Sequence, residues 1–190
     1  MLSQRRQKSA AREAVNIHYK NQMITQILSK IFRNTIYIKF SSEQIQLQYV
    51  EKQEVLKDEP LIAIKKKGSK NIVVAVGKAS KREHSKDPAN VEIHNAFKHP
   101  RTFVSNFEIA EATLRYFVYK LVKRKMFITP LVIFHPTENI EGGVTQIERR
   151  GLIELGASIG ARKTYIWTGR TLTDKELLDE DYLKQAEINY

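Results

Sequence analysis

Side chains able to do chemistry are sparse in this chain. Its 190 residues include no cysteine, which excludes disulfides, thiolate metal ligands and cysteine nucleophiles. Three of the five histidines, His84, His94 and His99, lie in or beside the charged stretch 78–97. His84 and His94 are not at the spacing of helical metal ligands, and no acidic pair converges on them. We therefore expect solvated loop histidines and no metal site.

Glu148 is the acidic residue with the most defined surroundings. It follows Thr145 by three residues, the spacing of a capping box, in which both side chains accept hydrogen bonds from free N–H groups at a helix start. An apolar stripe at helical spacing follows, made of Ile147, Leu152, Leu155 and Ile159. Gly160 suits the left-handed residue that ends a helix. The pattern predicts a helix capped by Glu148 and Thr145.

Two short apolar segments flank this predicted helix. Leu131–Phe134 precedes it, and the β-branched and aromatic segment Thr164–Trp167 follows it. The order strand, helix, strand requires parallel strands joined by a right-handed crossover. Gly151 and Gly156 each cost about 1 kcal/mol inside a helix relative to alanine, so we expect this helix to pack closely against a neighbour.

The part of the chain before this unit predicts mainly strands. The expected strands are Thr35–Phe40, Ile45–Val50, Leu61–Ile64 and Ile72–Val76. The polar turn 41–44 joins the first two as a hairpin. We expect residues 78–97 to be irregular, and Arg101–Val104 to return to the sheet.

Two further helices are expected. The segment 105–125 has a buried apolar stripe and begins with a capping box at Ser105. The segment 172–188 begins with a capping box of Thr173 and Glu176. The order β-β-β-β-α-β-α-β-α predicts an α/β fold with a mixed β-sheet and flanking helices.

The first 33 residues differ in composition from the rest. Residues 1–22 are basic and weakly patterned, which predicts a disordered tail. Residues 23–33 predict an amphipathic helix that either packs on protein or inserts into the headgroup layer of an anionic membrane. Its apolar face comprises Met23, Ile24, Ile27, Leu28, Ile31 and Phe32. Because no apolar run could span a bilayer and no secretory signal is evident, we expect a cytoplasmic protein, with peripheral contact at the inner face of the plasma membrane.

The formal net charge of +11 at pH 7 favours anionic partners. Nucleic-acid binding is one interpretation, based on the basic runs 65–67, 78–82 and 120–125. The aromatic residues have the pattern of core residues and do not interleave with these runs as stacking platforms would. We therefore do not expect nucleic acid among the partners.

Several segments match a known pattern. The most specific is T-Q-I-E-R-R at Thr145–Arg150. The weaker matches are Gly160–Arg162, Tyr165–Ile166, Glu59–Pro60, Ala75–Ala79 and Phe107. Over residues 23–167 the chain resembles the MreB family of bacterial actin homologues, which are rod-shape-determining proteins. The resemblance implies the first half of the actin-like, ribonuclease-H-like ATPase fold.

The residues that would bind nucleotide depart from the family pattern. The family's first hairpin carries a phosphate-binding D-L-G-T turn, whereas this chain has K-F-S-S at Lys39–Ser42. Lys39 replaces the aspartate, and lysine cannot ligate magnesium. The printed sequence also ends before the second half of the fold, so we expect that half to be absent. We therefore expect no cofactor, neither ATP nor magnesium.

The resemblance gives Glu148 a second interpretation, since it matches the family position that orients the attacking water in nucleotide hydrolysis. Glu148 is thus the candidate catalytic residue, although its spacing with Thr145 favours the cap. The expected organisation is a tail over 1–22, an amphipathic helix over 23–33, an actin-like half-domain over 34–170 and a C-terminal helix over 171–190.

Three functional hypotheses follow. The first is a non-catalytic actin-like module of cell-shape or cytoskeletal assembly, which binds an MreB-type filament, itself or an anionic membrane surface. The second is an ATPase that completes its site with another chain. The third is a basic nucleic-acid-binding protein. The altered phosphate turn favours the first hypothesis.

Overall fold

The computed structural model describes residues 34–123, 129–138, 143–179 and 182. These residues belong to one compact unit that begins at Asn34. The predicted tail and the predicted amphipathic helix with its apolar face, Met23 to Phe32, lie outside the described residues. None of the described helices is both long and apolar enough to cross a bilayer.

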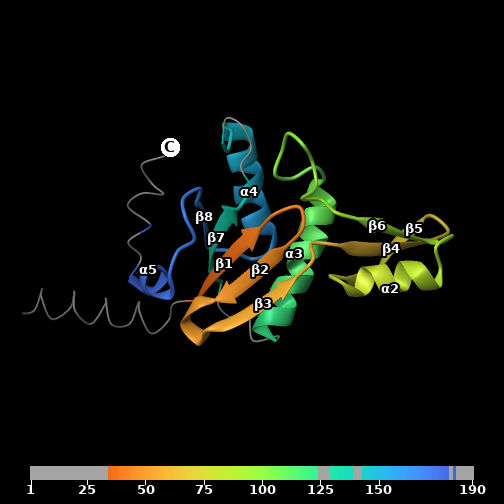
Figure 1. Ribbon diagram of the computed structural model, residues 1–190, viewed down its shortest axis with the longest axis horizontal. Coiled ribbons are helices and arrows are strands. Elements are labelled where there is room, and N and C mark those ends of the chain that lie inside the picture. The colour runs from red at the N-terminus through yellow and green to blue at the C-terminus, as the bar shows by residue number, and fades with distance from the viewer. Residues whose placement is uncertain (1–33, 124–128, 139–142, 180–181, 183–190) are drawn as a thin grey trace, which may run out of the picture. The chain divides into compact units, whose positions relative to one another are not determined.

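A mixed five-stranded sheet forms the centre of this unit (Figure 1), with strand order β3-β2-β1-β7-β8. The strands are β1 Thr35–Phe40, β2 Ile45–Tyr49, β3 Glu54–Asp58, β7 Leu131–Pro136 and β8 Lys163–Ile166. The pairs β1–β2 and β2–β3 are antiparallel, while β1–β7 and β7–β8 are parallel. A short 3-10 helix, η1 (Val50–Lys52), joins β2 to β3. The predicted mixed sheet and the predicted parallel pair around residues 131–167 are confirmed.

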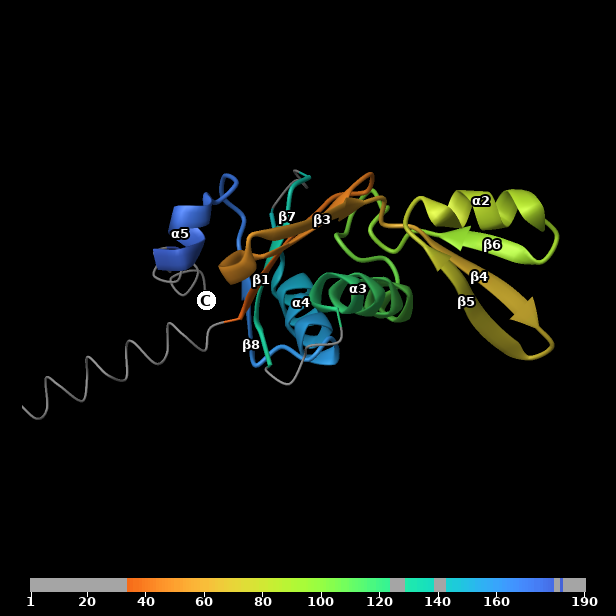
Figure 2. The ribbon, with the colours of Figure 1, turned by 90° about the horizontal axis from the view of Figure 1, so that it is seen from below.

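A second, three-stranded antiparallel sheet has the order β5-β4-β6. It consists of β4 Ile62–Lys67, β5 Lys70–Val76 and β6 Val91–His94, and helix α2 (Ala79–Lys86) packs against it (Figure 2). The prediction that residues 78–97 are irregular was wrong, as was the prediction of a strand at Arg101–Val104. Helix α2 lacks an apolar stripe, since Ser80 is its one buried residue, and this explains the missed helix.

The large sheet carries an apolar layer on each face. Helices α3 (Phe107–Val122) and α4 (Gln146–Ser158) lie together on one face (Figure 2). Alternate residues of β1 divide between the two layers: Ile36 and Ile38 join the cluster under α3 and α4, whereas Tyr37 joins the cluster that includes Leu177. Leu177 belongs to α5 (Asp174–Asp179), the described part of the predicted C-terminal helix.

Three helices were predicted to begin with a capping box. Thr145 with Glu148 caps α4, and Thr173 with Glu176 makes the same reciprocal contacts at α5, as predicted. The prediction for Ser105 was wrong, because Asn106 is the N-cap of α3 and its side chain accepts a hydrogen bond from the Ile109 N–H at 3.0 Å. The hydroxyl of Ser105 instead donates to the Ala96 carbonyl at 3.0 Å.

The predicted apolar stripe of α4 is confirmed at three positions and wrong at one. Leu152, Leu155 and Ile159 are buried in the core, but Ile147 is 86% exposed. Ile147 lies in the first turn of α4, and its side chain meets solvent there. Gly160 has a φ of 90°, which confirms the left-handed residue after this helix.

Candidate functional site

The carboxyl ends of the parallel strands β1, β7 and β8 meet at one edge of the large sheet. In open α/β sheets, ligands bind in the crevice outside such ends. The loops that begin there are the turn 41–44 after β1, the segment from residue 137 to α4, and the segment 167–173 after β8. The K-F-S-S segment, which corresponds to the family's phosphate turn, belongs to the first of these loops. This edge is therefore the candidate site.

Ser41 closes the turn between β1 and β2 with its own side chain. The Ser41 N–H donates to the Gln44 carbonyl at 2.8 Å, and the Ser41 Oγ accepts from the N–H groups of Gln44 at 3.0 Å and Glu43 at 3.2 Å. No non-glycine residue of this turn has a positive φ, so serine fits the glycine position of the family pattern without backbone strain. The hydroxyl takes two N–H groups of the turn.

Ser42 binds a carboxylate from the same chain. The Glu138 Oε1 accepts hydrogen bonds from the Ser42 N–H at 2.6 Å and from the Ser42 Oγ at 2.5 Å. Asn95 Nδ2 donates to the Ser42 carbonyl at 2.7 Å, and the Thr137 N–H donates to the Phe40 carbonyl at 2.9 Å. Hydrogen bonds to an ionised acceptor are stronger than neutral ones. The Ser42 N–H and hydroxyl are therefore both hydrogen-bonded to a carboxylate of the same chain.

Lys39 occupies the position of the family's aspartate and is half-buried. Its positive charge acts on the neighbouring His135. Within the described ranges, no group of three His, Asp or Glu side chains is arranged to hold a metal ion. The side chain at this position is a cation, and a cation disfavours the binding of magnesium.

His135 and Tyr37 form a buried polar pair behind this edge. The Tyr37 Oη lies 2.5 Å from His135 Nδ1 and accepts a hydrogen bond from the Leu172 N–H at 3.3 Å. The tyrosine hydroxyl therefore donates to Nδ1, which leaves Nε2 of a neutral imidazole to donate to the backbone of Gly169. The pair joins β1 and β7 to the loop after β8.

Burial is the largest cause of the pKa shift of both side chains. It raises the pKa of Tyr37 to about 12, against the hydrogen bond from Leu172, which acts to lower it. Burial also lowers the pKa of His135, and the charge of Lys39 lowers it further, while the hydrogen bond to the Gly169 backbone acts to raise it. Both side chains are thus held neutral near pH 7.

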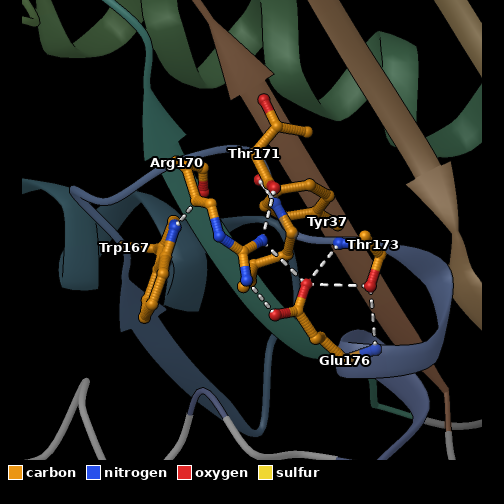
Figure 3. Close-up of polar contacts among 7 residues, drawn as sticks. Tyr37, Trp167, Arg170, Thr171, Thr173 and Glu176 are labelled. Carbon is orange, nitrogen blue, oxygen red and sulfur yellow. Dashed lines mark hydrogen bonds and ion pairs between the residues drawn. The ribbon is translucent and has the colours of Figure 1, made fainter.

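The loop after β8 is fixed by polar contacts within itself and with α5 (Figure 3). Arg170 and Glu176 point toward each other and form a bidentate ion pair, with Nη1 at 2.9 Å from Oε2. Glu176 Oε2 also accepts from the Thr173 N–H at 2.9 Å, and the Trp167 Nε1 donates to the Arg170 carbonyl at 2.6 Å. The hydrogen bond from Arg170 lowers the pKa of Glu176 to about 2.

Glu148 uses both carboxylate oxygens at the start of α4. Its Oε2 accepts from the Thr145 N–H at 3.0 Å, and its Oε1 accepts from the Phe103 N–H at 3.1 Å. Burial acts to raise the pKa of this carboxyl, but hydrogen bonds from Thr145, Phe103 and Thr102 outweigh it and hold the pKa below the ordinary value. The adjacent surface pocket has a volume of about 190 Å³.

The predicted close packing of α4 holds at one of its two glycines. A Cβ placed on Gly156 would lie 2.0 Å from Thr164 Oγ1, so α4 approaches β8 at a distance that only glycine allows. A Cβ on Gly151 would meet nothing within 4 Å. Gly156 therefore sets the separation of α4 from the sheet, while the expectation for Gly151 was wrong.

The structure brings together residues that the sequence pattern did not. It places Lys39–Ser42 beside Glu138 and His135, and it places Glu148 against the Thr102 side chain and the Phe103 backbone. No spacing rule links Ser42 to Glu138, which lies 96 residues away in the sequence. The alternation of side chains along a strand could have shown that Tyr37 and Lys39 lie on one face of β1 and Ile38 on the other.

The MreB/Mbl protein family model matches residues 16–172 of the chain. The cell shape-determining protein Mbl of Bacillus subtilis is 26% identical over 137 residues, and the cell shape-determining protein MreB of Haemophilus influenzae is 28% identical over 150 residues. These alignments cover 72% and 76% of this chain, and 38% and 40% of the relatives. The chain thus spans about 40% of the length of the curated relatives it matches.

Solved structures give the same fold. The crystal structure of MreB5 of Spiroplasma citri bound to ADP has a TM-score of 0.57 at 20% identity, covering 72% of this chain and 38% of that one. A non-polymerising mutant of MamK bound to AMPPNP has a TM-score of 0.54 at 10% identity, covering 70% and 40%. The fold is therefore the actin-like half-domain expected from the sequence, and the chain belongs to the MreB/Mbl family.

Proposed function

We propose that this chain is a non-catalytic MreB-type module of cell-shape or cytoskeletal assembly, which acts by binding protein and not by hydrolysing nucleotide. Membership of the MreB/Mbl family supports the assembly role, as do the relatives named cell shape-determining proteins. The observation that carries the non-catalytic part is the contact of Glu138 with Ser42.

This contact opposes phosphate binding in two ways. The Glu138 carboxylate takes the backbone N–H and the hydroxyl of Ser42, the donors that an incoming phosphate would need. Its negative charge would also repel a phosphate at the same place. In addition, Lys39 stands where the family pattern has an aspartate for magnesium, so this carboxylate ligand is missing.

Glu148 supports the same conclusion from the other part of the site. An efficient general base has a pKa near the working pH, whereas hydrogen bonds hold the pKa of Glu148 below its ordinary value. Both of its oxygens already accept hydrogen bonds from the chain. The role that fits these contacts is the cap of α4.

Equilibrium titration of the full chain with ATP and magnesium tests this proposal. We expect no saturable binding and no phosphate release, and the same result for the cap-preserving variant Glu148→Gln. Binding in the micromolar range together with hydrolysis would overturn the non-catalytic role. An assembly role further requires that the chain cosediments with MreB-type filaments or associates with itself.

The second candidate is an ATPase that completes its site with another chain. Its motivation is Glu148, together with the relatives' structures that carry ADP or AMPPNP. The test mixes this chain with a full-length MreB and measures phosphate release above that of the MreB alone. Loss of the excess in Glu148→Gln, with unchanged thermal stability, would support this candidate against the first.

A membrane role rests on the sequence of residues 23–33 alone. We propose that the face formed by Met23, Ile24, Ile27, Leu28, Ile31 and Phe32 contacts an anionic membrane surface at the cytoplasmic side. Deletion of residues 23–33 should then abolish sedimentation with anionic liposomes. Equal sedimentation of the deletion variant would exclude this segment as the anchor.

A further inference from the structure

Strand β5 is an exposed edge. It runs from Lys70 to Val76 and pairs with β4, and no other described strand pairs with it. Its outer side therefore presents backbone N–H and C=O groups without partners in the sheet, on the side away from β6 (Figure 2). Such a strand is a template for pairing with another chain.

The side chains of β5 are unusually apolar for an edge. Ile72, Val73 and Val74 are 42%, 48% and 39% exposed. These three are consecutive in sequence, whereas no two of the other exposed large apolar residues in the described ranges are consecutive: Val55, Phe107, Tyr116, Tyr119, Ile147 and Leu178. Ile72 and Val73 are neighbours in a regular ladder and so lie on opposite faces of the strand. Both faces of this edge are therefore apolar and exposed, and such an edge is a site for pairing with another chain.

The usual protections of an edge strand are mostly missing here. β5 contains no proline, and its one charged residue is Lys70 at the start. A register shift opposite Ala63 and Ile64 distorts the pairing with β4 near Val74, which leaves residues 70–73 as a regular ladder. By contrast β3, an edge of the large sheet, carries charged residues at both ends: Glu54, Lys57 and Asp58.

We propose that the outer edge of β5 pairs antiparallel with β5 of a second copy of this chain. The two three-stranded sheets would join across a two-fold axis into one six-stranded sheet. This inference deepens the proposed function, on whose assembly role it rests, by naming a surface for self-association. It requires no nucleotide.

Charge selects the direction of this pairing. Lys67 and Lys70 flank the turn at one end of β5, while Lys65 and Lys66 of β4 form ion pairs with Asp87 and Glu92. In a parallel pair the basic turns of two copies would lie side by side and repel, whereas an antiparallel pair places them at opposite ends. A two-fold axis near Ile72 and Val73 then places aliphatic residues opposite aliphatic residues, Asn71 or Lys70, with no like charges directly opposed. The edge of β5 is thus complementary to itself when antiparallel, as a two-fold contact between two copies requires.

Single cysteines test the contact directly, because the chain has none of its own. Ile72→Cys and Val73→Cys are made separately, and the position nearest the two-fold axis should form a disulfide dimer under mild oxidation, since directly opposed residues lie within disulfide reach. Val55→Cys is the matched control, an exposed valine on the edge strand β3. Equal cross-linking of all three variants, or none in either β5 variant, would overturn the proposal.

Sedimentation velocity of the full chain gives an independent measurement. Val73→Lys should raise the dimer dissociation constant about tenfold or more, because it opposes like charges across the pair. Val55→Lys should leave the constant unchanged. A chain that is monomeric at all concentrations, or a dimer insensitive to Val73→Lys, contradicts the β5 pairing. Neither result bears on the ATP titration or on cosedimentation with MreB-type filaments, so this proposal and the proposed function can fail separately.

Discussion

The start of α4 and the turn between β1 and β2 carry the two parts of the family's nucleotide site, and they differ in how this chain treats them. The α4 segment keeps the family-like sequence T-Q-I-E-R-R and forms a complete capping box. The turn has K-F-S-S, and its Ser42 contacts Glu138. In one region the family-like residues form a helix cap, while in the other a side chain of the chain itself accepts the hydrogen bonds of the turn.

The two regions show which contacts the fold requires. Helix α4 must approach β8 closely, and it uses Gly156 for this purpose. The turn needs acceptors for the N–H and hydroxyl of Ser42, which are part-buried, and a carboxylate from the loop after β7 supplies one. The fold therefore holds this turn through a side chain of its own.

The largest effect should come from Gly156→Ala. The added methyl group would meet Thr164 Oγ1 at 2.0 Å, which forces α4 away from the sheet and lowers the free energy of unfolding by about 1–3 kcal/mol. Gly151→Ala is the matched control in the same helix. It should raise the stability by about 0.5–1 kcal/mol, because alanine is the better helix residue and meets no neighbour. Urea denaturation of both variants measures the contrast, and similar changes would refute it.

The next effect concerns the cap. Glu148→Ala removes the acceptor for the N–H groups of Thr145 and Phe103, and it should lower the free energy of unfolding by about 1–2 kcal/mol. Glu148→Gln keeps a capping-box side chain and should recover most of this loss. Thermal unfolding of the two variants distinguishes them. An equal loss in both would show that the charge, and not the cap, provides the stability.

A smaller effect is expected at the turn. Glu138→Ala leaves the Ser42 N–H and hydroxyl to solvent, and the cost should be about 0.5–1.5 kcal/mol, the net value of a hydrogen bond that water can replace. Amide hydrogen exchange at Ser42 should become faster, while the amides of α4 keep their rates. Unchanged exchange at Ser42 would mean that Glu138 does not hold the turn.

The sequence predicted the large sheet better than the small one, for a physical reason. Strands β1, β2, β7 and β8 and helices α3 and α4 bury apolar residues at regular spacing, so their pattern is visible. Helix α2 packs with mainly polar residues, and β6 has four residues of which one, Val91, is buried. A hydrophobic pattern carries little information about such elements.

The candidate site was predictable only where its contacts are local in sequence. The capping boxes of Glu148 and Glu176 join residues three positions apart. The contacts of Ser42 with Glu138 and of Tyr37 with His135 join residues 96 and 98 positions apart, and the pairing of β1 with β7 creates them. Such contacts follow from sheet order, which the spacing of residues does not encode.

The smallest expected effect is a change with pH at the buried pair behind the turn. The pKa of His135 is lower in the folded chain than its ordinary value of 6.5, so the unfolded chain binds the proton first as the pH falls. Stability should therefore decline below about pH 6.5 and stop declining below the folded-state pKa. His135→Gln can still accept from Tyr37 and donate to Gly169, and it should flatten this dependence. Urea midpoints between about pH 7.5 and 5.5 test it, because stability from the lowered carboxyl pKa values of Glu148 and Glu176 is lost only at lower pH. An equal slope in the variant would mean that His135 is protonated in the folded chain, and that the Tyr37 pair does not hold it neutral.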